Sequence, residues 1–326
     1  MDARPRAVWF VAALAMYMPM CTPKVRPTAP TPQTPVASLW RSPDDLANRD
    51  LFHGVWGADR APRPEDRYTL IRVKRSGVNP GLTVRDGRGR KWSVKQPLPD
   101  ALGDEGPVEV TLSRVLSAVG YHQPPVYFLP SFSLTDDWGT RREPGGRFRL
   151  ADPSLEELAP WSWQQNPFVG SRPYQGLLAI LLLLKSSDLK NDNNSIYRYR
   201  QGDRIERWYV VRDLGTALGE TGRLAPRKNE VELFERSRFI IGVTRGFVQF
   251  DYRGWHQELV RNRLTPEDVR WGATLLFRLT DLQWHDAFRA GGYPPAVADR
   301  FIRKIQANIA EAMRVGEAPS SGSGSQ

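Results

Sequence analysis

Two stretches of sequence decide the fold: SDLKNDNNSIY at residues 187–197 and YVVRDLG at residues 209–215. They follow YQGLLAILLLLKSS at 174–187, a run that is apolar on every side and therefore predicts a buried helix. Alternating polar and apolar residues at 195–200 and 208–211 predict a pair of strands. A loop rich in acids and amides thus joins a buried helix to two strands, and Asp213 follows the second strand.

A small sheet is predicted upstream of these stretches. Alternating segments at 68–75, 82–86 and 91–96 are joined by the turn sequences SGVNPG and GRGR, which is typical of an antiparallel meander. EVTLSRVLSAV at 109–119 predicts a helix ended by Gly120, and further short strands are predicted at 126–129 and 148–150. Lys95 closes the third strand, and Glu109 opens the helix.

The second half of the chain is mostly helical in pattern. Helices are predicted at 230–240, 266–279, 283–290 and 295–314, the second introduced by the start signal TPED at 265–268. We expect an α+β fold in which residues 41–150 form a small antiparallel β-sheet with one helix, and residues 151–315 form a mostly α-helical part.

The order of five residues indicates a chemistry that none of them indicates alone. Taken singly, each has a plain structural explanation, such as a solvated strand lysine or an acid at a helix start. Phosphoryl transfer, however, depends on positioned charge: a lysine on phosphates, a glutamate on that lysine, an aspartate at the attacking hydroxyl, and oxygen ligands for Mg²⁺. The chain supplies these types in order: Lys95, Glu109, Asp188, Asn193 and Asp213.

On these motifs the chain resembles the protein-kinase-like superfamily, particularly its atypical branch, which includes HipA-like and phosphatidylinositol 3/4-kinase-like kinases. The resemblance covers about residues 66–315 and is most specific at 187–197 and 209–215, with a weaker match at WSVK, 92–95. It implies a two-lobed protein-kinase-like fold, ATP and Mg²⁺ as cofactors, and a nucleotide and an unknown phosphoacceptor as partners.

The resemblance also implies roles in the sheet and its helix. Lys95 matches the lysine that binds the nucleotide phosphates, and Glu109 matches its ion-pair partner. Gly77 and Gly81 lie where a glycine-rich phosphate loop would lie, but SGVNPG is not GxGxxG, and a plain hairpin explains it equally well.

Downstream, the resemblance makes Asp188 the catalytic-loop aspartate and Lys190 the lysine that steadies the transferred phosphoryl group. Asn193, five residues after Asp188, and Asp213 match the metal ligands. The loop holds other amides that stay open as alternatives: Asn191 and Asn194. The chain departs from protein kinases in having KSS in place of HRD before Asp188, and no APE-like anchor after Asp213.

The composition and the charge of the chain argue against several other classes of protein. The 326 residues include 46 Lys+Arg and 36 Asp+Glu, a net charge of +10. This charge is mostly arginine and is spread along the chain without a run of five like charges, which predicts a solvated basic surface. We therefore expect no nucleic-acid partner. One cysteine excludes an intramolecular disulfide scaffold and a cysteine zinc site, and four scattered histidines argue against a histidine metalloenzyme. No GxSxG motif supports a serine hydrolase.

The N-terminus has the pattern of an export signal. Basic residues precede an apolar run that ends at Cys21, which predicts a signal peptide over 1–21 and a lipid anchor on Cys21. An ordinary cleaved signal or a misassigned start codon stay open. A Pro/Thr-rich linker at 22–40 and a flexible tail at 316–326 are also predicted. We expect a periplasmic or membrane-anchored envelope protein, associated with the membrane only through that anchor.

Three functions remain in view at this point. The complete set of charged residues favours an active Mg-ATP phosphotransferase. The export signal favours a kinase-fold binding module without catalysis, a pseudokinase, because the periplasm is poor in ATP. The basic surface would also suit an exported polyanion binder, whose affinity should depend on salt.

Overall fold

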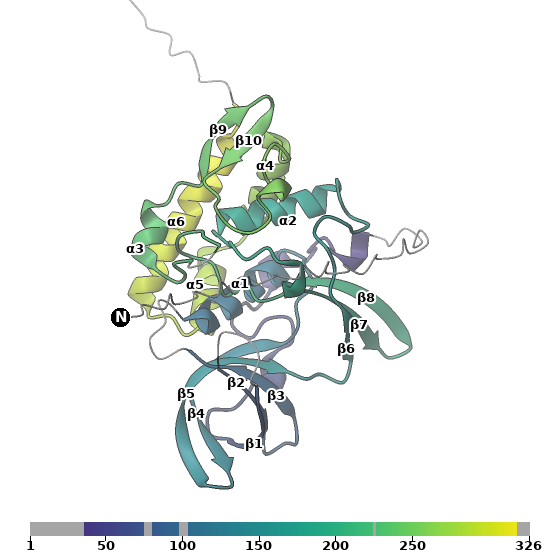
Figure 1. The fold of residues 1–326 in the computed structure, drawn as a ribbon, viewed down its shortest axis with the longest axis vertical. Helices are drawn as coiled ribbons and strands as arrows, with labels where there is room; N and C mark the ends of the chain where they lie inside the picture. Colours follow the sequence, from purple (N-terminus) through teal and green to yellow (C-terminus); the bar gives the residue numbers. More distant parts are fainter. Residues whose placement is uncertain (1–35, 75–79, 98–103, 224–225, 318–326) are drawn as a thin grey trace, which may run out of the picture. The chain divides into compact units, whose positions relative to one another are not determined.

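The strands predicted in the first half are part of a barrel. The computed structural model describes residues 36–74, 80–97, 104–223 and 226–317. The barrel has the strand order β1-β2-β3-β5-β4 and is closed by a parallel pairing between β1 and β4 (Figure 1). Its strands are β1 (Arg67–Lys74), β2 (Gly81–Arg85), β3 (Lys91–Lys95), β4 (Val126–Asp136) and β5 (Gly139–Leu150).

The barrel corrects one prediction and confirms others. The three strands of the meander are confirmed, and a helix follows the third. The short strands at 126–129 and 148–150 are the two ends of one long hairpin, β4–β5. The prediction of a small antiparallel sheet is therefore wrong in this respect, because the long strand β4 reaches β1 and pairs with it in parallel, which closes the barrel. The polar sequence GTRREP at 139–144 hid this extension, since it has no apolar alternation.

Aromatic side chains fill the barrel. Tyr68, Phe132 and Phe148 pack edge to face or tilted at centroid distances between 5.1 and 5.7 Å, and Trp92 is buried beside them. Successive residues of a strand point to opposite faces, so Trp92 and Val94 enter this core. Lys95 consequently points away from it, toward the pocket described below.

A second sheet and a hairpin complete the described strands. The sheet has the order β6-β7-β8, formed by β6 (Leu155–Ala159), β7 (Asn194–Gln201) and β8 (Arg204–Val211). The hairpin joins β9 (Ile240–Thr244) to β10 (Phe247–Phe250). The pair β7–β8 was predicted, whereas β6, β9 and β10 were not.

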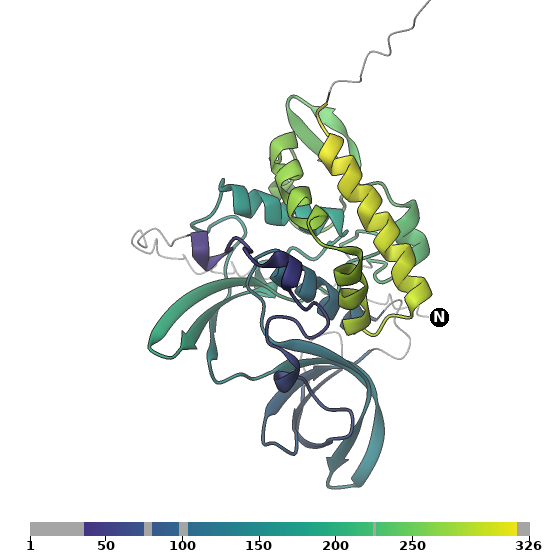
Figure 2. The same ribbon diagram turned by 180° about the vertical axis from the view of Figure 1, so that it is seen from behind.

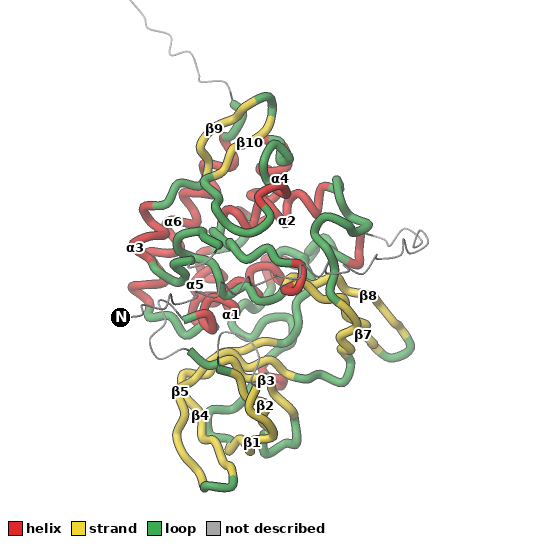
Figure 3. Tube along the Cα trace, viewed as in Figure 1, coloured by secondary structure: helices red, strands yellow, loops and turns green. Residues whose placement is uncertain are grey.

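Most of the predicted helices are present. The structure describes α1 (Glu105–Ala118), α2 (Arg172–Leu183), α3 (Val231–Arg236), α4 (Pro266–Phe277), α5 (Asp281–Ala290) and α6 (Pro295–Arg314). Figure 3 shows the helices outside the barrel, and α1 also contacts the barrel strands β4 and β5. The helix expected at 230–240 ends early, because Ile240 already belongs to β9. There are also short 3₁₀ turns: η1 (Val36–Ser38), η2 (Leu46–Asn48), η3 (Ala58–Arg60), η4 (Asn191–Asn193) and η5 (Gln257–Leu259).

The helices pack tightly on one another. Thr265 and Asp268 form the predicted capping box at the start of α4. Helices α2 and α4 cross closely at Gly176, where a β-carbon would lie 2.2 Å from the ring of Trp271. Figure 2 shows the long helix α6 alongside α4 and α5, and it also contacts α3.

Two clusters of buried apolar residues result. One fills the barrel, and the other joins α1 to the remaining helices. Strand β8 contributes to both, because Trp208 and Val210 belong to the barrel cluster while Tyr209 and Val211 belong to the helical one. The sheet β6-β7-β8 therefore connects the two cores.

The N-terminal part of the described chain is anchored to the end of α1. The Trp40 indole donates a hydrogen bond to the Val119 carbonyl at 2.8 Å, and Arg49 donates to the carbonyls of Ser117 and Ala118. The last residues of the predicted 22–40 linker thus contact the fold, and residues 36–317 belong to one compact unit. The predicted signal, Cys21, Gly77 and most of the predicted tail lie outside the described residues. Within the described ranges, every helix is too short or too polar to cross a membrane.

Candidate active site

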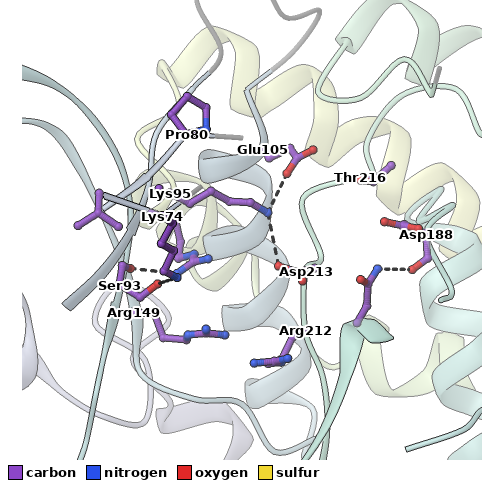
Figure 4. Close-up of a pocket in the computed structure, with 14 residues that line it drawn as sticks. Lys74, Pro80, Ser93, Lys95, Glu105, Arg149, Asp188, Arg212, Asp213 and Thr216 are labelled. Carbon is purple, nitrogen blue, oxygen red and sulfur yellow. Dashed lines mark hydrogen bonds and ion pairs between the residues drawn. The ribbon is translucent and has the colours of Figure 1, made fainter. Parts of the chain in front are cut away.

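One pocket brings together most of the residues selected from the sequence. It has a volume of about 310 Å³ and lies between β3, the start of α1, the loop after α2 and the end of β8 (Figure 4). Of the predicted site residues, five line it: Gly81, Lys95, Asp188, Asn193 and Asp213. Glu109 lies just behind, Lys190 lies beside it, and Gly77 is outside the described residues.

Lys95 is surrounded by carboxylates. Its Nζ lies 2.8 Å from Glu105 Oε2 and 3.4 Å from both Glu109 Oε2 and Asp213 Oδ1. Burial alone would lower the pKa of Lys95, but the coulombic effect of Glu109, Asp213 and Glu105 outweighs it and raises the pKa. Lys95 is therefore a fixed positive charge held at the pocket wall.

Glu109 has a second and closer partner. Its Oε1 lies 2.9 Å from Arg147 Nε, and both side chains are only 5% exposed. Arg147 faces Lys95 across the β3–β5 pairing, which explains how one glutamate reaches both cations. The predicted Lys95–Glu109 pair is present, but Glu109 also neutralises a buried arginine, and Glu105 is the nearer carboxylate to Lys95.

The start of α1 places Glu105 at the site. The Asp104 side chain caps the helix by accepting a hydrogen bond from the Gly106 amide at 2.9 Å. Glu105 and Glu109 are four residues apart and therefore share one helix face. Gly215 lets the chain after Asp213 approach this turn, because a β-carbon there would lie 2.6 Å from Glu105 Cβ.

The loop that carries Asp188 is held from the segment 251–255. Buried Lys185 donates to the Asp251 carbonyl at 2.8 Å and lies 3.3 Å from its carboxylate. The Ser187 carbonyl accepts hydrogen bonds from the Trp255 amide and the Tyr252 hydroxyl. The KSS segment before Asp188 is thus anchored by these contacts, which help to fix the position of Asp188.

The amides of this loop have different surroundings. Asn193 lines the pocket, and its Nδ2 donates to the Asp188 carbonyl at 2.9 Å. Asn191 accepts a hydrogen bond from the Trp163 amide, and buried Asn194 donates to the Trp161 carbonyl. The two alternatives therefore have structural partners away from the pocket.

Lys190 stands at the edge of the site. Its Nζ lies 2.9 Å from Asp188 Oδ1 and 5.0 Å from the centre of the Trp255 ring. Its side chain is 42% exposed, so it can change position at little cost. The contact with Trp255 is a cation–π interaction that keeps the ammonium group near Asp188.

Asp213 follows β8 in a left-handed backbone conformation, with φ of 50°. Such a conformation is uncommon outside glycine and is concentrated at functional sites. Burial raises the pKa of this carboxyl, but the cations around it, Lys95 first, outweigh burial and hold the pKa below its usual value. Asp213 is therefore ionised near neutral pH.

The donor set fits Mg²⁺ bound together with phosphates. Asp213 and Asn193 offer oxygen ligands in one pocket, and Mg²⁺ commonly takes only one or two carboxylates plus phosphate oxygens and water. In the part of the chain that the structure describes, no group of three or more His, Cys, Asp or Glu is placed to hold a metal alone. A metal here would need oxygens from a ligand.

Sequence reasoning missed the basic side of the pocket. Besides Lys95, four basic residues line it: Lys74, Arg147, Arg149 and Arg212. The available signal was RFR at 147–149, whose outer residues point to the same side of a strand while Phe148 enters the core. The nearby Glu105 was missed because the helix was expected to begin at Glu109.

Comparison with known proteins gives a weak structural likeness. No protein-family model matches the chain, and no curated protein matches it. Among solved structures, it is similar to the crystal structure of the proinflammatory kinase CtkA from Helicobacter pylori, with 10% sequence identity and a TM-score of 0.37. The similarity covers 76% of this chain and 98% of that one. A likeness this weak does not by itself establish the fold or the activity of this chain.

Proposed function

We propose that the protein is a Mg-ATP-dependent phosphotransferase of kinase-like fold. The observation that carries the proposal is the convergence of Lys95, Asp188, Asn193 and Asp213 on one pocket of about 310 Å³. These residues come from segments as far apart as 95 and 213, and Lys95 Nζ lies 3.4 Å from Asp213 Oδ1. If Lys95 were only a solvated strand lysine and Asp213 only a turn residue, the two side chains would not be expected to lie in contact.

The architecture supports the same proposal. The barrel with α1 would be the smaller lobe and the helical part the larger one, in line with the two apolar clusters and the connecting sheet. The pocket would then be the cleft between the two lobes, reached from both by charged side chains.

In this proposal each residue has one task. Lys95 binds phosphate oxygens and is positioned by Glu105 and Glu109. Asp213 and Asn193 hold Mg²⁺, which when bound neutralises charge on the phosphates. The Asp188 carboxylate accepts the proton of the attacking hydroxyl as the new O–P bond forms and the bond to the leaving phosphate breaks.

Ligand binding tests the proposal directly. We expect ATP with Mg²⁺ to raise the unfolding temperature of the wild type, because a ligand of the folded state stabilises it. The shift should be lost in Asp213→Asn and Lys95→Met. A matched control is Asp203→Asn, an exposed turn residue that should leave the shift intact. Wild-type protein that shows no shift with any nucleotide would contradict the proposal.

A binding module without catalysis is the second candidate. It is favoured by the way Glu105, Glu109 and Asp213 already neutralise Lys95, since such a network also stabilises a fold. Transfer of radiolabelled phosphate from ATP to protein or lipid extracts separates the two functions. Transfer that disappears in Asp188→Ala supports the enzyme, and nucleotide binding without transfer supports the binding module.

The location of the protein is proposed from the N-terminal sequence. Export and a lipid on Cys21 would place it in the bacterial envelope. Labelling with radioactive palmitate, compared between the wild type and Cys21→Ala, tests the anchor. Label that is equal in both proteins would contradict it.

A further inference from the structure

The pocket has two sides of different charge. Lys95 and the carboxylates Glu105 and Asp213 form one side, and the other side is built from Lys74, Arg149 and Arg212, here called the basic wall (Figure 4). In all, five basic and three acidic residues line the pocket within the described ranges. The carboxylates neutralise Lys95, but they do not explain why three further basic side chains line the opposite side of the pocket.

The wall is a product of strand register. Lys95 of β3 pairs with Gly81 and Arg147, and Gly81 pairs with Lys74, so these residues form one row across the barrel. Ser93 and Arg149 form the next row on the same side. Lys74 of β1 and Arg149 of β5 therefore line the pocket, while Trp92 and Phe148, on the opposite face of β3 and β5, lie in the barrel core.

The guanidinium groups of the wall face each other. Figure 4 shows Arg149 and Arg212 pointing toward one another from β5 and from the end of β8. Among the residues that the structure describes, the Arg149 side chain makes no hydrogen bond and no ion pair, and Arg212 Nε is buried without a hydrogen-bond partner. The other end of Arg212 is paired, because Nη1 lies 2.8 Å from Glu157 Oε2.

The nearest carboxylates are already engaged. Glu109 and Asp213 line a small cavity of about 10 Å³ behind Arg149, but Glu109 lies 2.9 Å from Arg147 and Asp213 lies 3.4 Å from Lys95. Burial, followed by the neighbouring Arg147, lowers the pKa of Arg149. Holding such a cation without a partner costs stability, which a bound anion would recover.

We propose that Lys74, Arg149 and Arg212 form a phosphate-binding subsite, separate from the phosphates that Lys95 and the metal would hold. Guanidinium forks suit phosphate oxygens because they donate two parallel hydrogen bonds. The ligand of this pocket would then carry phosphoryl groups toward both sides. This inference deepens the proposed function by naming a substrate class: a multiply phosphorylated small molecule, or a phosphorylated acceptor bound beside the donor.

The test measures the binding of inorganic pyrophosphate to the purified protein by calorimetry, in the absence of Mg²⁺. We expect Arg149→Gln to weaken pyrophosphate binding by about tenfold or more, the loss of one hydrogen-bonded charge. Arg149→Lys should recover part of the affinity, and the exposed strand residue change Arg207→Gln should have no effect. Wild-type affinity in Arg149→Gln would overturn the inference.

A second comparison separates this subsite from the proposed catalytic site. Lys95→Met should keep pyrophosphate binding without Mg²⁺ while losing the response to Mg-ATP. If Lys95→Met abolishes pyrophosphate binding and Arg149→Gln does not, the anion binds on the carboxylate side and the inference fails, whatever the outcome for ATP. A wild-type protein that binds pyrophosphate through Arg149 but does not respond to Mg-ATP would instead contradict only the proposed function.

Competition then identifies the source of the phosphate. Mg-ATP that displaces pyrophosphate from the wild type shows that the subsite holds part of the nucleotide. Simultaneous binding of both shows that the subsite serves a second, phosphorylated substrate. An independent readout is stability: without ligand, Arg149→Gln should unfold at a higher temperature than the wild type, because a facing cation is removed. A lower unfolding temperature would indicate a structural role and overturn the inference.

Discussion

The ion pair between Glu109 and Arg147 gives the sharpest test of the site. Both side chains are 5% exposed and their charged atoms lie 2.9 Å apart. Glu109→Gln keeps the shape of the side chain but leaves Arg147 as a buried cation without its counterion. Removing one partner of a buried pair costs about 3–5 kcal/mol of unfolding free energy.

This free energy corresponds to a large change in melting temperature. At about 2–4 °C per kcal/mol, the apparent Tm should fall by roughly 6–20 °C. Circular dichroism during heating measures this directly. The control is Glu156→Gln, which breaks the exposed 2.7 Å pair with Arg198 and should cost no more than about 1 kcal/mol.

A double-mutant cycle with Arg147→Met decides whether the pair is the cause. If the two charges depend on one another, the double variant should be more stable than the sum of the single losses predicts, by roughly 0.5–3 kcal/mol. Losses that simply add would refute the reasoning. Lys95 still has Glu105 at 2.8 Å in these variants, so binding of Mg-ATP should survive wherever the protein remains folded.

Three further predictions concern the pocket and the helices. The pKa of Lys74 is lowered to about 8 by burial and then by Arg149, Arg147 and Arg72, so pyrophosphate affinity should fall as pH rises through about 8, a step absent from Lys74→Met. Because the folded state releases this proton before the unfolded chain does, the same group should make stability rise between about pH 8 and 10.5, which denaturant titrations at several pH values would check. Gly215→Ala should lower both the Tm and the Mg-ATP response, since the new methyl group meets Glu105, while Gly87→Ala, with open space around it, should change neither. Gly176→Ala should cost about 1–3 kcal/mol through overpacking against Trp271, and Trp271→Leu should relieve part of that cost in the double variant.

The sequence predicts the elements better than their connections. Periodicity is sufficient for β1, β2, β3 and the long helix α6, whose bounds agree with the expectation at 295–314. Barrel closure was not predictable in the same way, because the β1–β4 pairing joins segments whose alternation is interrupted by polar residues. Pairing between distant strands leaves no local pattern.

The site shows the same division. The spacing that singled out Lys95, Asp188, Asn193 and Asp213 agrees with a shared pocket, since each lies at the end of a predicted element or in the loop between two of them. Glu105 escaped notice, although the helix-start signal of Asp104 followed by proline in the first turn was available. RFR at 147–149 was a local signal for one part of the basic wall, but the wall as a whole has no local pattern, because Lys74 and Arg149 come from the barrel and Arg212 follows β8 of the other sheet.

Helix α1 connects the pocket to the N-terminal part of the described chain. Its 14 residues form a stiff rod of about 21 Å. At its first residue, Glu105 forms an ion pair with Lys95. At its other end, the carbonyls accept hydrogen bonds from the side chains of Trp40 and Arg49. A displacement of Trp40 would therefore reach α1 through a direct hydrogen bond to the end of the helix. The same helix thus contacts Trp40 at one end and the pocket lysine, Lys95, at the other.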